Sequence, residues 1–287
     1  MQQGPGFYRR RVGDAVVTVL SDGWLDGSTD IVVGIDDAEK HAVMARHFRK
    51  PGPLRLALNS FLIAHNGRLA MVDAGGGPNF NPGTGKAAAN LRAAGHTADE
   101  IDTVLITHLH PDHILGLLDD AGAARYPNAT LRVHAAEHAH WHSDAAKAAT
   151  PEPFQVFFDA ARNVCAAYAG RVALHEDGEV FPGVTALPLP GHTPGHTGYH
   201  VRGEEDLLIW GDIFHIPELQ ARHPQTQIVF DVNPELAAKT RTATLARVAE
   251  QRQLVAGMHL CFPAFSHLRA DSAGYSLVPE LWLAEVF

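Results

Sequence analysis

The chain has 287 residues, with 23 Lys and Arg against 32 Asp and Glu, which gives a formal net charge of −9. This charge balance does not suit the phosphate backbone of a nucleic acid, so we expect no nucleic-acid partner. Only two cysteines are present, so no disulfide framework is expected. No apolar run approaches the length of a membrane span, and none follows the arginines of residues 1–11. The sequence therefore predicts a cytoplasmic protein without a signal peptide or membrane contact.

Short strands and helices alternate along the chain. In the first half we predict strands at 15–20, 56–64, 68–72, 103–106 and 131–134, and helices at 86–94, 114–120 and 154–168. In the second half we predict strands at 184–189, 199–201 and 207–210, followed by a helix at 234–252. Two strand-rich halves, each followed by helices, indicate an α/β sandwich. We predict a single domain over residues 1–287, because the polar motifs described below are spread from residue 108 to residue 259.

Two segments do not fit this alternation. Residues 1–11 are interpreted as an N-terminal tail. Residues 28–53 have mixed charge and little periodicity. We interpret this second segment as a long excursion that covers either the functional site or a partner subunit.

The most informative stretch, at residues 107–113, reads Thr-His-Leu-His-Pro-Asp-His. It places four strong metal ligands in six positions: His108, His110, Asp112 and His113. Alternation lets the first two imidazoles converge on one cation, whereas Asp112 and His113 suit a second cation beside it. Imidazole and carboxylate together suit zinc or a similar first-row metal. An apolar run at 103–106 leads into the motif, which is typical of ligands at the mouth of a buried strand.

Three later segments supply further candidate ligands. His192 lies in a turn rich in Gly and Pro, Asp212 follows the apolar run 207–210, and His259 follows another apolar stretch at 254–256. Each lies at the end of a predicted strand, so all of them can meet on one rim of the fold. His196 and His267 are the alternatives to His192 and His259, which we favour.

The order H-x-H-x-D-H, then G-H, then G-D, then a late His resembles the metallo-β-lactamase superfamily, and most closely its methyl parathion hydrolase and lactonase branch. The resemblance runs from about Val12 to the C-terminus. It implies an αββα sandwich of two mixed sheets flanked by helices. It also implies two Zn²⁺ ions per chain: one held by His108, His110 and His192, the other by Asp112, His113 and His259, with Asp212 bridging both. Class B1 β-lactamases have a cysteine where this chain has Asp212, and neither Cys165 nor Cys261 falls there.

The same resemblance suggests roles for residues around the ligands. We predict that Asp73 and His196 support the ligands from behind, with Asp73 accepting a ring N–H from a ligating histidine. The segments that match pocket-lining loops of the branch contribute the predicted substrate pocket: Trp24, Leu25, Phe80, Trp141, Phe157 and His215. Relatives in this branch pair through N-terminal excursions, so we also expect a homodimer.

Two adjacent dications sharing a water would lower its pKa from about 15.7 toward 7 and hold a bridging hydroxide at neutral pH. Asp212 and Asp112 are the carboxylates that we predict to act beside this hydroxide. No tyrosine is placed as a general acid, which favours substrates whose leaving group departs as an anion. The function predicted is therefore a dinuclear zinc hydrolase that opens neutral lactones or cleaves aryl esters. The alternatives are a phosphotriesterase and, from another class, a metal-dependent binding protein without turnover.

A second group of histidines, at 134, 138, 140 and 142, lies on a predicted strand-to-helix segment. His138 and His142 have the i, i+4 spacing that permits metal binding. We interpret the group as surface or pocket-rim histidines.

Overall fold

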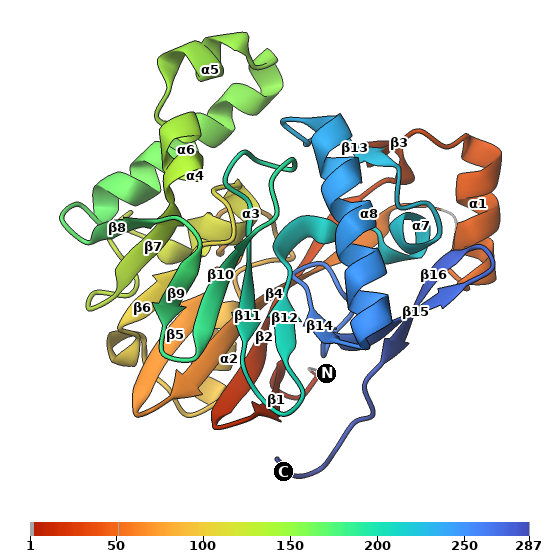
Figure 1. The fold of residues 1–287 in the computed structure, drawn as a ribbon. Helices are drawn as coiled ribbons and strands as arrows, with labels where there is room; N and C mark the ends of the chain where they lie inside the picture. Colours follow the sequence, from red (N-terminus) through yellow and green to blue (C-terminus); the bar gives the residue numbers. More distant parts are fainter. Residues whose placement is uncertain (1–2, 51, 287) are drawn as a thin grey trace.

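The computed structural model describes residues 3–50 and 52–286, and its strands form two seven-stranded sheets that pack face to face (Figure 1). The first sheet has the order β1-β2-β4-β5-β6-β7-β8. Its strands are β1 Phe7–Val12, β2 Ala15–Gly27, β4 Leu54–His65, β5 Arg68–Val72, β6 Thr103–Leu105, β7 Thr130–His134 and β8 Val172–His175. Strands β5 to β8 run parallel and the others pair antiparallel. The sheet is therefore mixed, as predicted.

The second sheet has the order β16-β15-β14-β12-β11-β10-β9. Its strands are β9 Gly178–Phe181, β10 Val184–Pro188, β11 Thr197–Val201, β12 Leu207–Ile209, β14 Leu254–Ala256, β15 Phe265–Asp271 and β16 Gly274–Pro279. Only β12 and β14 pair parallel in this sheet. A separate two-stranded sheet joins β3 Val32–Val33 to β13 Gln227–Ile228.

Successive side chains of a strand point to opposite faces of its sheet, so each strand contributes residues to two layers. On β4, Phe61 and Ile63 face the second sheet, whereas Leu62 points to the opposite side, where the helices pack. The same alternation places Ala70 and Val72 of β5 between the sheets. One core therefore lies between the two sheets and another lies under the helices of the first sheet.

Helices cover both outer faces and complete the predicted αββα sandwich. The first sheet is covered by α2 Ala87–Ala93, α3 Pro111–Ile114, α4 Ala135–Trp141 and α6 Gln155–Ala167, with α5 Asp144–Ala149 beyond them. The second sheet is covered by α8 Pro234–Gln251, with α7 Pro217–Arg222 beside it. Short 3-10 turns at Thr29–Ile31, Ala98–Glu100, Leu115–Leu117, Glu152–Phe154 and Gly211–Ile213 connect the elements.

The structure corrects several predicted segments. The expected tail at 1–11 is ordered from Phe7 onward as the edge strand β1. Strand β2 does not stop at Leu20 but continues through a bulge at Ser21 and Gly23. The helix predicted at 114–120 begins earlier, because Pro111 suits a first helical turn, and its last turn is a 3-10 turn that ends at Leu117. Gly116 there packs so closely on the Ala74 carbonyl that any side chain would clash.

The excursion at 28–53 folds onto its own chain rather than remaining without regular structure. It contains β3 and the helix α1 Asp37–Arg46, which is capped by the Asp36 carboxylate accepting from the Glu39 N–H. Val43 and Met44 of α1 are buried against Ile216 and Leu219. The hydrophobic pattern of α1 is weak, so this tertiary packing holds the helix.

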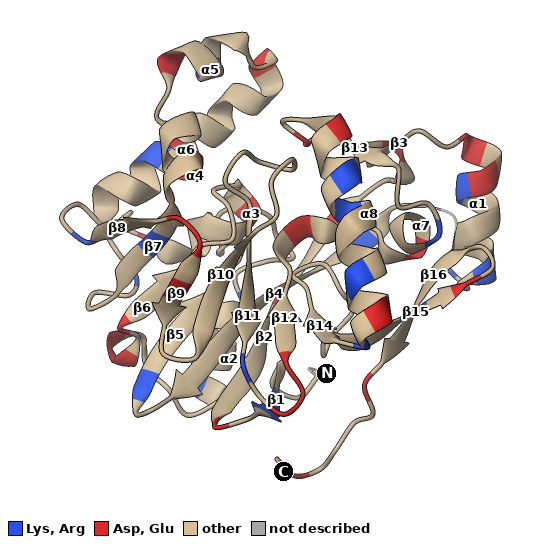
Figure 2. Cartoon of the chain, in the orientation of Figure 1, with Lys and Arg blue, Asp and Glu red and all other residues tan. Residues whose placement is uncertain are grey.

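Acidic and basic side chains are interspersed over the surface, and α8 carries both kinds (Figure 2). Within the described residues, none of the helices combines the length and the apolar character that a membrane crossing needs.

Candidate metal centre

The candidate ligands lie where strands of both sheets end on one rim. The loop after β6 carries His108 and His110, and His110 is the N-cap of α3. His192 lies in the turn between β10 and β11, Asp212 follows β12, and His259 follows β14. Because β12 and β14 run parallel, their carboxyl ends bring Asp212 and His259 together. The structure therefore brings together residues that are up to 151 positions apart in the sequence, from 108 to 259.

The ligand atoms form two groups of three. Those of His108, His110 and His192 lie within 4.8 Å of one another, and so do those of Asp112, His113 and His259. These are the two sets that the sequence resemblance assigns to separate ions. Each set offers three ligands and leaves room for another, as a catalytic metal site requires.

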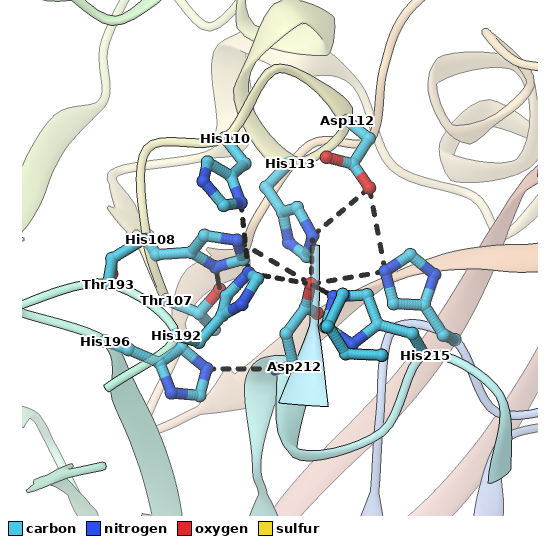
Figure 3. Close-up of polar contacts among 12 residues, drawn as sticks. Thr107, His108, His110, Asp112, His113, His192, Thr193, His196, Asp212 and His215 are labelled. Carbon is cyan, nitrogen blue, oxygen red and sulfur yellow. Dashed lines mark hydrogen bonds and ion pairs between the residues drawn. The ribbon is translucent and has the colours of Figure 1, made fainter. Parts of the chain in front are cut away.

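Asp212 lies between the two groups (Figure 3). Its Oδ2 atom is 3.7 Å from His108 Nε2 and 3.5 Å from His192 Nε2 on one side, and 3.3 Å from both His113 Nε2 and His259 Nε2 on the other. A carboxylate with this placement can contact an ion in either group.

The polar atoms of the cluster are buried without ordinary partners. Within the described residues, His108 Nε2, His113 Nε2 and Asp212 Oδ1 have no hydrogen-bond partner. His110 Nδ1 and His192 Nε2 face each other at 3.0 Å. Buried groups left unsatisfied in this way cost free energy, and they are rare without an ion or a water. The donor set therefore fits a pair of first-row dications.

A second layer of groups orients the ligands. The Asp73 carboxylate accepts from His113 Nδ1 at 2.7 Å, as predicted, and Asp231 accepts from His192 Nδ1 at 2.8 Å. His259 Nδ1 donates to the Ala57 carbonyl oxygen at 2.9 Å. Each contact directs the opposite ring nitrogen, Nε2, into the cluster. Asp231 lies on a loop with no motif around it, and no sequence signal could have identified it.

The alternative ligands are placed elsewhere. His196 Nδ1 donates to the Leu189 carbonyl at 2.8 Å, and its Nε2 accepts the backbone N–H of Asp212 at 2.9 Å. It thus positions the Asp212 backbone, in keeping with a supporting role. His267 lies on β15 and contacts the Arg252 carbonyl at 3.1 Å, away from the cluster.

Glu137 of α4 is a buried group that the sequence did not reveal. Its Oε1 accepts from the Leu109 N–H at 2.8 Å and from Trp141 Nε1 at 2.6 Å. Its Oε2 accepts from the Thr193 hydroxyl at 2.6 Å and the Gly195 N–H at 3.0 Å. Four donors from two ligand loops and α4 therefore converge on one carboxylate.

Burial and neighbouring charge set the protonation of the cluster. Burial, together with nearby imidazoles, holds the pKa values of His108 and His110 well below their ordinary range, so both are neutral and able to bind metal. Burial opposes ionisation of Asp212, but the imidazoles of His113 and His259 outweigh it and keep its pKa well below the ordinary value. In return, Asp212 and Asp112 overcome the effect of burial on His113 and raise its pKa. The metal-free cluster thus holds a proton that a bound dication would displace.

An aromatic hollow of about 240 Å³ opens next to His110 and Asp231. It is lined by His140, Trp141, Phe154, Phe157, Phe158 and Phe230, among others. The rings of Trp141 and Phe157 stand edge-on to His110, with centroids at 5.4 and 5.3 Å. Of the six predicted pocket residues, Trp141 and Phe157 therefore lie beside the cluster.

The other four predicted pocket residues lie outside this hollow. Trp24, Leu25 and Phe80 are not among the residues that line this hollow. The Trp24 ring packs against the cations of Lys86 and Arg55 instead, with Nζ of Lys86 3.8 Å from the ring centroid. His215 lies within the cluster itself, with Nε2 3.1 Å from Asp212 Oδ2 and its ring stacked on His259.

Two mixed sheets between helices, with a His and Asp cluster on their rim, define an α/β metal-dependent hydrolase. The chain belongs to the metallo-beta-lactamase superfamily, whose family model matches residues 55–258. No curated protein matches the chain in sequence.

Solved structures resemble the chain over nearly its whole length. A hydrolase of the beta lactamase superfamily, AbOPH, is 29% identical, with a TM-score of 0.93 over 98% of this chain and 100% of its own. AidC, a dizinc quorum-quenching lactonase in complex with the product N-hexanoyl-L-homoserine, is 24% identical, with a TM-score of 0.91 over 97% and 98%. An N-acyl homoserine lactone hydrolase with the same product at its catalytic metal centre is 19% identical, with a TM-score of 0.59 over 88% and 99%.

Proposed function

We propose that this protein is a dinuclear zinc hydrolase of neutral lactones or aryl esters, in the lactonase and methyl parathion hydrolase branch of its superfamily. The observation that carries the proposal is the pair of three-ligand groups on either side of Asp212, opening beside an aromatic hollow. Similarity to AbOPH and to the dizinc lactonase AidC supports it.

The chemistry proposed for the centre requires both groups of ligands. Two zinc ions, when bound, supply an activated water and polarise the substrate carbonyl. Asp112 and Asp212 provide negative charge around the centre, and Asp73 and Asp231 hold one ligand of each group in the correct tautomer. The lining of the hollow is mainly aromatic and includes Asp231 but no Lys or Arg, so it favours an uncharged acyl or aryl group over an anionic one.

We assign to His215 the role of hydrogen-bond donor to the oxygen of the substrate's leaving group. It lies beside Asp212 but outside the two groups of three, and within the described residues its Nδ1 atom has no partner. Burial lowers the pKa of His215 to about 4, so its ring is neutral and only one of its nitrogens carries a proton. The assignment places that proton on Nε2, the nitrogen that faces Asp212 and the cluster. None of the residues lining the hollow is a tyrosine that could take this part instead.

The decisive experiment combines elemental analysis with a hydrolysis panel. The panel contains an aryl acetate, an aromatic lactone, an acyl-homoserine lactone, a paraoxon-type triester and a glutathione thioester, each with and without chelator. We expect zinc-dependent turnover of lactones or aryl esters, loss of that turnover on chelation, and recovery when zinc is restored. Turnover of the triester alone would favour the phosphotriesterase alternative. Zinc-loaded protein that binds these esters without cleaving them would contradict the proposal in favour of a binding protein.

A further inference from the structure

A second cluster of potential metal ligands lies away from the rim. It consists of His138 on α4, His142 at the C-cap of the same helix, and Cys165 on α6. One ligand atom from each of the three lies within 4.8 Å of the other two. The cluster shares no residue with the candidate metal centre.

The two imidazoles are already arranged side by side. Their rings stack with centroids 3.9 Å apart and an interplanar angle of 14°. His142 Nδ1 lies 2.9 Å from the His138 carbonyl oxygen, to which its N–H donates. This contact fixes the tautomer and leaves the Nε2 lone pair free, the arrangement that metal-binding histidines commonly show.

Cys165 completes the set from the neighbouring helix. It is buried, and burial raises the pKa of its thiol to about 11, so the free side chain is protonated and unreactive at neutral pH. A dication that binds here forms a metal–sulfur bond while the thiol proton leaves to solvent, which conserves charge and needs no oxidant. Thiolate and imidazole ligands together select zinc over calcium or magnesium.

We propose that His138, His142 and Cys165 form a separate, mononuclear zinc site whose fourth position is open to water. The ion ties α4 to α6. Helix α4 also carries Glu137 and Trp141, and α6 carries Phe157 and Phe158, so an ion here holds together two walls of the aromatic hollow. The proposal concerns metal binding and does not depend on the proposed function.

Cobalt substitution distinguishes this site from the rim cluster. A Co²⁺ ion bound to thiolate gives an intense near-ultraviolet charge-transfer band, and the rim cluster has only imidazole and carboxylate ligands. The chain has two cysteines, so Cys165 and Cys261 are the only sources of such a band. We expect the band in the wild-type protein titrated with Co²⁺ and in the Cys261→Ser control, and its loss in Cys165→Ser.

His142→Ala keeps the buried sulfur and tests the site without disturbing the packing of α6. Its Co²⁺ affinity, followed by the same band, should fall by at least the roughly 10–100-fold that loss of a supporting group costs. The proposal is overturned if Co²⁺ fills the rim cluster without producing the band. It is equally overturned if the band survives in Cys165→Ser, or if His142→Ala binds Co²⁺ as tightly as the wild type does.

Discussion

The Thr193 hydroxyl donates to Glu137 Oε2 at 2.6 Å, and this hydrogen bond joins the two ligand loops through α4. On its other oxygen the same carboxylate accepts from the Leu109 N–H, between His108 and His110. Glu137 therefore fixes the distance between the loop after β6 and the turn between β10 and β11, which are far apart in the sequence.

Glu137→Gln tests this link. An amide has one acceptor oxygen, and its other end is an NH₂ group that cannot accept a hydrogen bond. The donors that now bond to one of the two Glu137 oxygens would therefore lose their acceptor. We expect a loss of roughly 1–3 kcal/mol in the free energy of unfolding, the usual cost of unsatisfied buried donors, together with weaker zinc retention. Chemical denaturation and zinc analysis measure both quantities. The exposed Glu152→Gln change is the matched control, and equal behaviour of the two variants would refute the role.

Asp212→Ala tests the bridge. Asp212 faces both groups of ligands, so its removal should leave at most one ion per chain and abolish hydrolysis. Elemental analysis and the ester panel measure the two effects. A variant that kept both ions and wild-type turnover would refute the bridging assignment.

Asp73→Asn and Asp231→Asn should each weaken the binding of a different ion. Asp73 supports His113 and Asp231 supports His192, so each change should lower the affinity of its own ion by roughly 10–100-fold and leave the other nearly unchanged. Zinc titration against a competing chelator resolves the two affinities. Asp14→Asn, at an exposed position, serves as the control. Loss of both ions in either variant would mean that the two groups do not bind independently.

Phe157→Ala is the better test of substrate selection. Trp141 also lines the hollow, but its Nε1–H donates to Glu137, so its removal would disturb the ligand loops as well as the hollow. Phe157 has no polar side-chain atom, and its ring forms a T-shaped pair with His110 at a centroid distance of 5.3 Å. We expect a loss on the order of 1–3 kcal/mol in transition-state binding for an aromatic lactone, and less for a short aliphatic one. Measured kcat/KM values that fall equally for both substrates would show that Phe157 does not discriminate between aromatic and aliphatic lactones.

A homodimer through residues 28–53 is also a prediction. Val32, Val43 and Met44 of this segment pack on its own chain, but Phe48 is 94% exposed, as an apolar contact residue would be in a separated protomer. Phe48→Ser should therefore weaken dimerisation in analytical ultracentrifugation. Trp282→Ser, which changes another exposed aromatic outside the segment, should leave it intact. A wild-type protein that sediments as a monomer at micromolar concentration would refute the prediction.

The sequence by itself determined the family, the fold class and the set of residues that gather on the rim. His108, His110, Asp112 and His113 are recognisable because four ligands of two types, imidazole and carboxylate, follow closely after a buried strand. His192, Asp212 and His259 follow strands in the same way. Ligand chemistry and strand ends are local properties, so a linear pattern records them.

Only the tertiary structure decided what surrounds these ligands. Glu137 and Asp231 carry no motif, and their roles follow from distant side chains that fold against them, the Thr193 hydroxyl and the His192 ring. Trp24 and Trp141 are the same residue type in the sequence, but strand β2 places Trp24 against Lys86, whereas helix α4 places Trp141 beside His110. Helix α1 likewise forms because Val43 and Met44 pack against Leu219. Contacts of this kind depend on where whole elements lie in space, which no local pattern encodes.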